Sequence, residues 1–366
     1  MEKLDLKYFN KSEYVIDFFD CYIKYKKEDK KTNIFRNAKI SYATYSRVKK
    51  GESNAGDIIA VKLRKYFKYK KINSKTFDVI ENKINEIYNK IYFKYNDKYT
   101  IEIQWLDNLL SQKTTLEPVL ILFKLLILAT INMPEKYKEE CSNLFLKIKP
   151  YKFVFKNCLK ELYFIVELIF EKEVDDLSLK SDYSNDLVLQ TLSTKMLEMN
   201  NVFASLYFAE KVAGKFLDNG NIKRYLLVMS NTMACHNKLK EYEKTKIQGI
   251  NLLGTFNSLK YDDIEYQLCS LHLLIAYLNL NLYKEVINLL VKSNKFNMND
   301  ICCFMLASRK LGDVNYLLLN SKIQPDEIDK KQLITMLDDL DDEKMNILDT
   351  KYCISKEILT LLNELK

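Results

Sequence analysis

Apolar residues recur every three or four positions along most of the chain, which is the spacing of amphipathic α-helices. In residues 13–26 this spacing places Val15, Phe18, Phe19 and Tyr22 on one helical face. Further helices are expected at 28–39, 41–50, 57–67 and 76–95, and from residue 104 to the end. Only 7 glycines and 4 prolines interrupt the 366 residues, too few for the many turns of a sheet protein. The sequence therefore predicts an all-α fold.

The second half of the chain repeats one pattern, a helix, a short polar turn and a second helix. Residues 224–253 form one such unit and residues 264–291 another. Their turns, near Lys240 and Asn281, lie about forty positions apart, so the units are longer than tetratricopeptide repeats of about 34 residues. Such degenerate tetratricopeptide-like units are expected to stack into a curved α-solenoid whose concave face binds extended peptides.

Residues 41–51 form the candidate recognition helix. Ser41 can cap its start, Tyr45 and Val48 supply one apolar stripe, and Gly51 can end it in a left-handed conformation. A helix in the major groove of DNA needs short side chains for close approach, donors for base edges and cations for phosphates. The candidate DNA contacts are Ser41, Tyr42, Ala43, Thr44, Ser46, Arg47, Lys49 and Lys50. The alternative is an ordinary amphipathic surface helix.

The distribution of charge favours a DNA recognition helix over an ordinary surface helix. Residues 1–98 hold 24 Lys and Arg against 13 Asp and Glu, a net charge of +11, whereas the remainder has a net charge of −3. Most of the excess lies between Cys21 and Thr76. A small basic module on a mildly acidic body suits a polyanion that binds the module alone.

A candidate peptide site follows from the repeats. On the first helix of the unit that begins at Arg224, side chains spaced three or four apart share a face with Asn231. Asn can bond both backbone groups of an extended peptide, and Arg can bind its terminal carboxylate. The candidate peptide contacts are Asn200, Arg224, Val228, Asn231, Thr232, Cys235, Gln267, Ser270, Leu274 and Tyr277. The alternative is that Asn231 and Thr232 simply form hydrogen bonds inside the helix stack.

Signatures of catalysis and cofactor binding are missing from the sequence, which has no Gly-rich phosphate loop, G-x-S-x-G elbow or H-E-x-x-H motif. Its 2 histidines, His236 and His272, lie far from a second plausible ligand, so neither an enzyme nor a metal or cofactor site is expected. The 8 cysteines form no C-x-x-C pair and lie mostly among apolar residues, as in a reduced cytoplasmic protein. The apolar run 118–133 contains Lys124 and is short for a membrane span, so it is expected to be a buried helix.

These patterns predict a chain in several parts. They are a helix-turn-helix domain (1–73), a linker helix (74–103), a repeat domain (104–332) and C-terminal capping or dimerisation helices (333–366).

The run Ile40-Ser-x-x-Thr-Tyr-Ser-Arg-Val-x-x-Gly51 resembles the recognition helix of the phage-repressor-like (Cro or XRE) helix-turn-helix family. In that family the run reads S-x-x-T-[aliphatic]-S-x-[aliphatic]-E-x-G. This chain departs from it at Tyr45, where the family has an aliphatic residue, and at Lys49, where the family has Glu. The Gln that usually begins the second helix is also missing, and Asp29-Lys-Lys-Thr32 stands in its place.

A helix-turn-helix followed by degenerate repeats resembles the peptide-pheromone-regulated transcription factors of the RRNPP group. Within that group, the segment Arg224-Tyr…Ser230…Thr232…Lys240-Glu-Tyr-Glu-Lys is most similar to the arbitrium (AimR-type) receptors of temperate phages, although the Gly-Asn of their pattern is Ala234-Cys235 here. The resemblance implies a cytoplasmic homodimer that binds promoter DNA to control lysis and lysogeny and responds to a short signalling peptide. Rgg-like or PrgX-like regulators of quorum sensing or conjugation share this architecture, and a helical protein–protein interaction scaffold without specific DNA binding is the alternative of another class.

Overall fold

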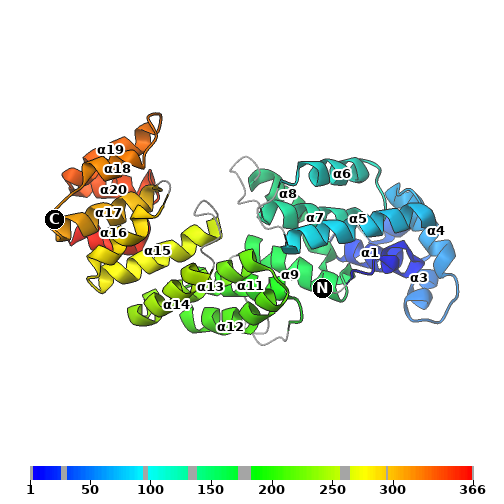
Figure 1. Ribbon diagram of the computed structural model, residues 1–366. Helices are drawn as coiled ribbons and strands as arrows, with labels where there is room; N and C mark the ends of the chain where they lie inside the picture. Colours follow the sequence, from blue (N-terminus) through cyan, green and yellow to red (C-terminus); the bar gives the residue numbers. More distant parts are fainter. Residues whose placement is uncertain are drawn as a thin grey trace. The chain divides into compact units, whose positions relative to one another are not determined.

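The computed structural model describes residues 3–25, 31–93, 98–130, 138–171, 183–255, 264–293 and 296–364 (Figure 1). Within these ranges the secondary structure is helical, apart from one isolated bridge between Lys70 and Thr114, so the predicted all-α class is confirmed. The chain divides into two compact units, Met1–Leu192 and Ser193–Lys366. No helix in the described ranges is both long and apolar enough to cross a bilayer.

The first unit begins with a group of short helices. These are η1 (Lys7–Asn10), α1 (Ser12–Tyr25), α2 (Lys31–Asn37), α3 (Tyr42–Lys49) and α4 (Gly56–Phe67). Their shared core is aromatic: Phe19 of α1 packs edge-on against Phe35 of α2, Tyr45 of α3 and Phe67 of α4. The expected start of the second helix, at residue 28, lies outside the described residues.

Longer helices complete this unit. They are α5 (Ser74–Phe93), α6 (Thr100–Ser111), α7 (Glu117–Thr130), α8 (Lys138–Ile148), η3 (Lys149–Val154) and α9 (Cys158–Phe170). The sequence predicts α5 to be a linker helix, but α5 packs on α7 and buries Phe77, Ile80, Ile84 and Ile87. Its apolar stripe therefore belongs to the core of the first unit, and the linker role of α5 stays a prediction.

The apolar helix α7 is buried, as expected, and its one cationic side chain, Lys124, forms ion pairs inside the unit. The Nζ of Lys124 lies 2.7 Å from Asp107 Oδ1 on α6 and 2.6 Å from Glu140 Oε1 on α8. Burial opposes the charge of Lys124, but its hydrogen bonds to the two carboxylates outweigh this and raise its pKa. The ion pairs thus hold three neighbouring helices together.

The N-terminal segment, residues 3–9, forms a strap that is anchored on α5. Leu4 and Leu6 are buried, and their backbone N–H groups donate to Asn85 Oδ1 at 2.8 Å and to Glu81 Oε1 at 2.7 Å. The Asn85 amide in turn donates to the Leu4 carbonyl at 3.2 Å. The helix side chains thereby satisfy the irregular backbone that precedes η1.

The second unit is a stack of antiparallel helices. It comprises α11 (Asp186–Glu198) from Ser193 on, α12 (Val202–Asp218), α13 (Ile222–Lys238), α14 (Tyr242–Thr255), α15 (Ile264–Asn279), α16 (Tyr283–Val291), α17 (Met298–Lys310), α18 (Tyr316–Ser321), α19 (Ile328–Asp338), α20 (Asp342–Thr350) and α21 (Lys356–Asn363). In the C-terminal segment, Leu333, Leu337 and Ile358 share a core cluster with residues of α15 and α17. That segment therefore covers the apolar end of the stack.

The same turn conformation recurs between helices of this unit. Asn200, Lys240 and Asn281 each have a positive φ of 58–60° and follow α11, α13 and α15, respectively. After each of them the next N–H donates back to a carbonyl five residues earlier, at 2.8 Å, as in a Schellman motif. Because these positions recur about every forty residues, the spacing expected from the sequence is also the spacing of the helix hairpins.

Candidate functional site

The ends of α3 follow the predicted boundaries to within one residue. Ser41 takes the N-cap position with an extended backbone (φ −71°, ψ 129°), although its hydroxyl makes no capping bond. Gly51 has φ +75°, its N–H donates to Val48 O at 3.0 Å, and the Glu52 N–H donates to Arg47 O at 2.8 Å. These two bonds are those of a Schellman motif, which uses the left-handed conformation that glycine adopts freely.

Tyr45 anchors the inner side of α3. Its ring lies 5.5 Å from that of Phe19 and 5.2 Å from that of Phe35, and its hydroxyl donates to Asp20 Oδ1 at 3.3 Å. Burial, together with the adjacent Asp20 carboxylate, raises the pKa of Tyr45, so the phenol stays protonated and remains a donor. The aromatic residue that departs from the family pattern therefore fits an aromatic core.

The outer side of α3 is open. Tyr42, Ala43, Arg47 and Lys50 are exposed, whereas Thr44 and Ser46 are half-buried. No ion pair among the described residues engages Arg47 or Lys50. Tyr42 is 65% exposed but packs edge-on against Phe35, with 5.3 Å between the ring centres, so its hydroxyl is held at the surface.

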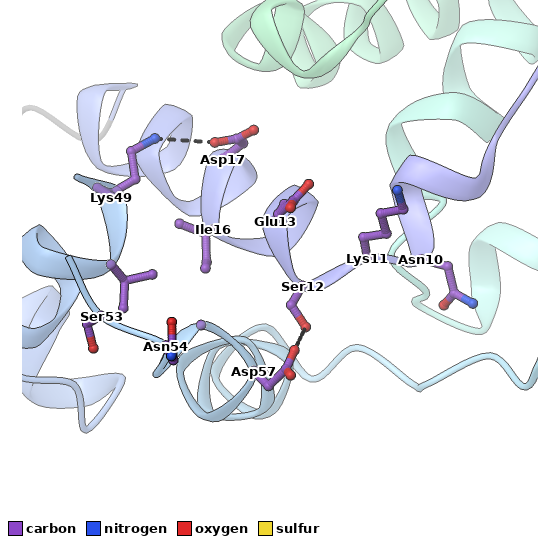
Figure 2. Close-up of a pocket in the computed structure, with 12 residues that line it drawn as sticks. Asn10, Lys11, Ser12, Glu13, Ile16, Asp17, Lys49, Ser53, Asn54 and Asp57 are labelled. Carbon is purple, nitrogen blue, oxygen red and sulfur yellow. Dashed lines mark hydrogen bonds and ion pairs between the residues drawn. The ribbon is translucent and has the colours of Figure 1, made fainter. Parts of the chain in front are cut away.

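Lys49, another predicted DNA contact, is directed toward α1. Its Nζ lies 3.2 Å from Asp17 Oδ1 (Figure 2). It also lies 3.6 Å from Asp20 Oδ2. Asp17 also accepts a 2.5 Å hydrogen bond from the Tyr8 hydroxyl and lies 3.6 Å from the Nζ of Lys156. Two carboxylates thus neutralise the charge of Lys49 in this structure, and its contact with DNA stays a prediction. Sequence reasoning missed this pairing, although Asp17 and Asp20 stand one helical turn apart on α1.

A surface depression of about 780 Å³ lies beside this ion pair, between the start of α1, the end of α3 and the start of α4 (Figure 2). Its walls carry Glu13, Asp17 and Asp57 as well as Lys11 and Lys49, and the Ser12 hydroxyl donates to Asp57 Oδ1 at 2.6 Å. Carboxylates outnumber cations here, so the depression does not suit a phosphate group. The open side of α3 is the better polyanion surface.

Further basic residues accompany α3. Arg36 of α2, Lys39 in the α2–α3 turn, and Lys62 and Lys65 of α4 are exposed. The Nζ of Lys62 donates to the Lys39 carbonyl at 3.0 Å, which places α4 next to that turn. Lys39 itself has φ 55° and is followed by a hydrogen bond from the Ile40 N–H to Phe35 O.

The predicted peptide contacts of α13 lie inside the helix stack. Arg224, Val228 and Cys235 are buried with Asn231, whose amide donates to Ser193 Oγ at 3.3 Å and to Thr194 Oγ1 at 3.0 Å on α11. The remaining member of the α13 set, Thr232, faces the other way. Its hydroxyl donates to Met229 O at 2.8 Å and accepts from Gln248 Nε2 of α14 at 2.6 Å.

The other predicted peptide contacts do not line an open face with these. Ser270, Leu274 and Tyr277 of α15 are buried, and Gln267 is half-buried. Asn200 lies in the turn after α11 and is exposed, and its Oδ1 accepts a hydrogen bond from Lys238 Nζ at 3.1 Å. Asn231 and Thr232 thus form hydrogen bonds inside the helix stack, which is the alternative to peptide binding given by the sequence. The assignment of a peptide site stays a prediction.

Both histidines are placed within the repeat helices. The Nδ1 of His236 lies 2.8 Å from Glu241 Oε2 across the α13–α14 turn. Burial lowers the pKa of His272 to about 4, and Glu357 opposes this only in part. All the cysteines are free thiols, and among the described residues no group of three His, Cys, Asp or Glu side chains could hold a metal ion.

Comparison with known proteins gives no match to a family model, to a curated protein or to a solved structure. The functional interpretation therefore rests on the residues and contacts described above.

Proposed function

We propose that the protein is a DNA-binding transcriptional regulator and that α3 is its recognition helix. The observation that carries the proposal is the division of α3 into two sides. Tyr45 fixes one side in an aromatic core, and the other side presents Arg47 and Lys50 to solvent. A helix that is rigidly seated and open on a small, polar and basic side meets the needs of major-groove binding.

The side chains on the open side of α3 and at its two caps have distinct roles in this proposal. The Arg47 guanidinium reads a guanine through two parallel hydrogen bonds, and the methyl group of Ala43 allows close approach to a thymine methyl. Lys50 neutralises a phosphate, and the hydroxyl groups of Ser41, Tyr42 and Ser46 donate to the backbone or to base edges. Arg36 and Lys62 extend the basic surface beyond α3.

DNA binding tests this proposal directly. The purified protein is titrated against its own upstream DNA and against a scrambled duplex over a series of salt concentrations. We expect specific binding that weakens steeply with salt and that Arg47→Ala abolishes. Lys284→Ala, which removes an exposed cation from α16, is the charge-matched control and should leave binding unchanged. Equal binding to both duplexes, or no binding at low salt, would instead favour a protein-interaction scaffold.

We further propose that a short signalling peptide bound by the repeat unit controls this DNA binding, as in arbitrium-type control of lysis and lysogeny. The regular spacing of the hairpin turns supports a repeat architecture of the kind that binds peptides. Because Asn231 and Thr232 are bonded inside the stack, a peptide must use neighbouring exposed side chains or open the α11–α13 contact.

Thermal denaturation with synthetic peptides encoded beside the gene tests ligand control. A peptide at 100 times its dissociation constant should stabilise the folded protein by about 2.7 kcal/mol. The same peptide should change the affinity for DNA. If no such peptide raises the melting temperature, the control mechanism is wrong, although DNA binding by α3 is not affected by that result.

A further inference from the structure

A cavity of about 280 Å³ lies inside the first unit, where α1 meets α7, α8 and η3. Its aromatic walls are Phe18 of α1, Tyr69, which follows α4, and Tyr151 of η3. The rings of Phe18 and Tyr151 are stacked, with 4.2 Å between their centres and 9° between their planes. Ile121 of α7 and Ile148 of α8 add apolar surface. The volume is close to the lower end of known ligand pockets, about 300 Å³, so the cavity suits a molecule of amino acid size.

Two opposite charges line this cavity without pairing with each other. Glu117 at the start of α7 is half-buried, and Lys147 near the end of α8 is exposed. No ion pair among the described residues engages either of them. The Oε2 of Glu117 accepts a hydrogen bond from the Tyr69 hydroxyl at 3.1 Å, which leaves its other oxygen able to accept from a ligand. The cavity therefore offers one anionic and one cationic group to a ligand with complementary charges.

Tyr14 adds a polar group without a partner close to the cavity. It is fully buried, and its ring lies 6.0 Å from that of Phe18. Its hydroxyl has no hydrogen-bond partner among the described residues. Burial raises the pKa of Tyr14, and Tyr69, Glu117 and Tyr151 are among the groups that raise it further, so the hydroxyl lies within electrostatic reach of the cavity wall. A buried hydroxyl without a partner is unfavourable, and a polar atom held in the cavity would relieve it.

We propose that this cavity binds a small zwitterion, with its cationic nitrogen beside Glu117 and its carboxylate beside Lys147. The aromatic walls hold the apolar part of the ligand and also favour its cation. An amino acid with an apolar side chain and a betaine share this chemistry, and they differ in whether the nitrogen can donate to Glu117. The inference depends neither on DNA binding by α3 nor on a peptide in the repeat unit.

Equilibrium dialysis of the full-length protein tests the site, with labelled L-leucine, L-phenylalanine and glycine betaine as the probes. We expect saturable binding of one molecule per chain. Binding of glycine betaine alone would identify a quaternary ammonium ligand, which is held by the aromatic walls. Binding of the amino acids alone would identify a ligand that donates to Glu117. If none of the three binds saturably, the proposal is wrong.

Analogues that carry a single charge test the two ends of the ligand. The amides of the two amino acids, and choline, lack the carboxylate. The N-acetyl amino acids, and 3,3-dimethylbutanoate in place of glycine betaine, lack the cationic nitrogen. Each analogue should bind more weakly than its zwitterion by roughly tenfold or more, the effect of one lost bond to a charged group.

Substitutions assign each end of the ligand to a residue. Lys147→Gln should remove the preference for the zwitterion over the analogue without a carboxylate, and Glu117→Gln the preference over the analogue without a cation. Glutamine keeps an acceptor for the Tyr69 hydroxyl and favours helix as glutamate does, so both variants should fold.

Matched controls carry the same changes outside the cavity. Glu139→Gln alters an exposed carboxylate in the first turn of α8, as Glu117→Gln does in the first turn of α7, and Lys160→Gln removes an exposed cation from α9. Both should bind like the wild type. Wild-type affinity in Glu117→Gln or Lys147→Gln, or equal affinity for a zwitterion and its single-charge analogues, would overturn the proposal.

Discussion

At the scale of single residues, Lys49 and Lys50 follow one another at the end of α3 and have opposite surroundings. Lys49 is paired with Asp17 and Asp20, whereas Lys50 is exposed and forms no ion pair among the described residues. A cation that neutralises carboxylates releases no counterion from DNA, and one that contacts a phosphate does.

The two lysines should therefore differ in the salt dependence of DNA binding. Lys50→Ala should reduce the slope of log K against log salt by about 0.9, the value for one lost phosphate contact. Lys49→Ala should reduce this slope by much less, because the charge it removes is already neutralised. Fluorescence anisotropy at several salt concentrations gives both slopes, and equal reductions would show that Lys49 leaves its carboxylates to bind DNA.

His272 provides a second test at this scale, through pH. Its pKa of about 4 in the folded protein lies below the ordinary value of about 6.5, so on acidification the unfolded chain takes up the proton first. The free energy of unfolding should therefore fall between about pH 6.5 and pH 4, by about 1–3 kcal/mol. His272→Gln should lack this part of the loss. Urea denaturation of both proteins across this range measures the difference, and parallel pH profiles would contradict the assignment to His272.

At the scale of elements, the sequence was most informative where a local rule decides the structure. The left-handed Gly51, the buried Tyr45 and the forty-residue spacing of the turns all follow from conformational preference or from periodicity. The packing of α5 on α7 did not follow, because an amphipathic stripe does not reveal which neighbour covers it. The surroundings of the predicted peptide contacts on α13 did not follow either: helical spacing groups Arg224 with Asn231, but only the structure shows that Asn231 donates to side chains of α11.

Two helical glycines should respond oppositely to the same substitution. Gly249→Ala should lower the free energy of unfolding by about 1–2 kcal/mol, because the new methyl group collides with Met233 and Leu273 and this outweighs the gain in helix preference. Gly214→Ala should raise the free energy of unfolding by about 0.5–1 kcal/mol, since its methyl group meets open space. Both values come from urea denaturation at low protein concentration, and a stabilised Gly249→Ala would show that the contact relaxes without cost.

At the scale of the whole molecule, the chain has two compact units and a single tryptophan, Trp105, which lies on α6 of the first unit. Tryptophan fluorescence therefore reports on the first unit, while circular dichroism reports on the helices of both. The two signals should separate in equilibrium unfolding wherever the units differ in stability.

Matched core substitutions should move these signals independently. Leu6→Ala empties a buried position in the strap and should destabilise the first unit by about 2–4 kcal/mol, which shifts the fluorescence transition. Leu290→Ala makes the same change on α16 of the second unit. It should shift the part of the circular dichroism transition that comes from the second unit and leave the fluorescence transition unchanged. Coincident transitions in the wild type and both variants would show instead that the two units unfold as one.

The strap also has a consequence for the order in which the protein is made. Leu4 and Leu6 leave the ribosome well before their partners Asn85 and Glu81, which follow 81 and 75 positions later. At about 5–20 residues per second, the strap waits roughly 4–16 s before α5 can receive it. Phe155, which packs against Phe9, emerges later still. The helices proposed to touch DNA are thus synthesised before α5, but the nascent chain must extend to Phe155 before their unit can close around the strap.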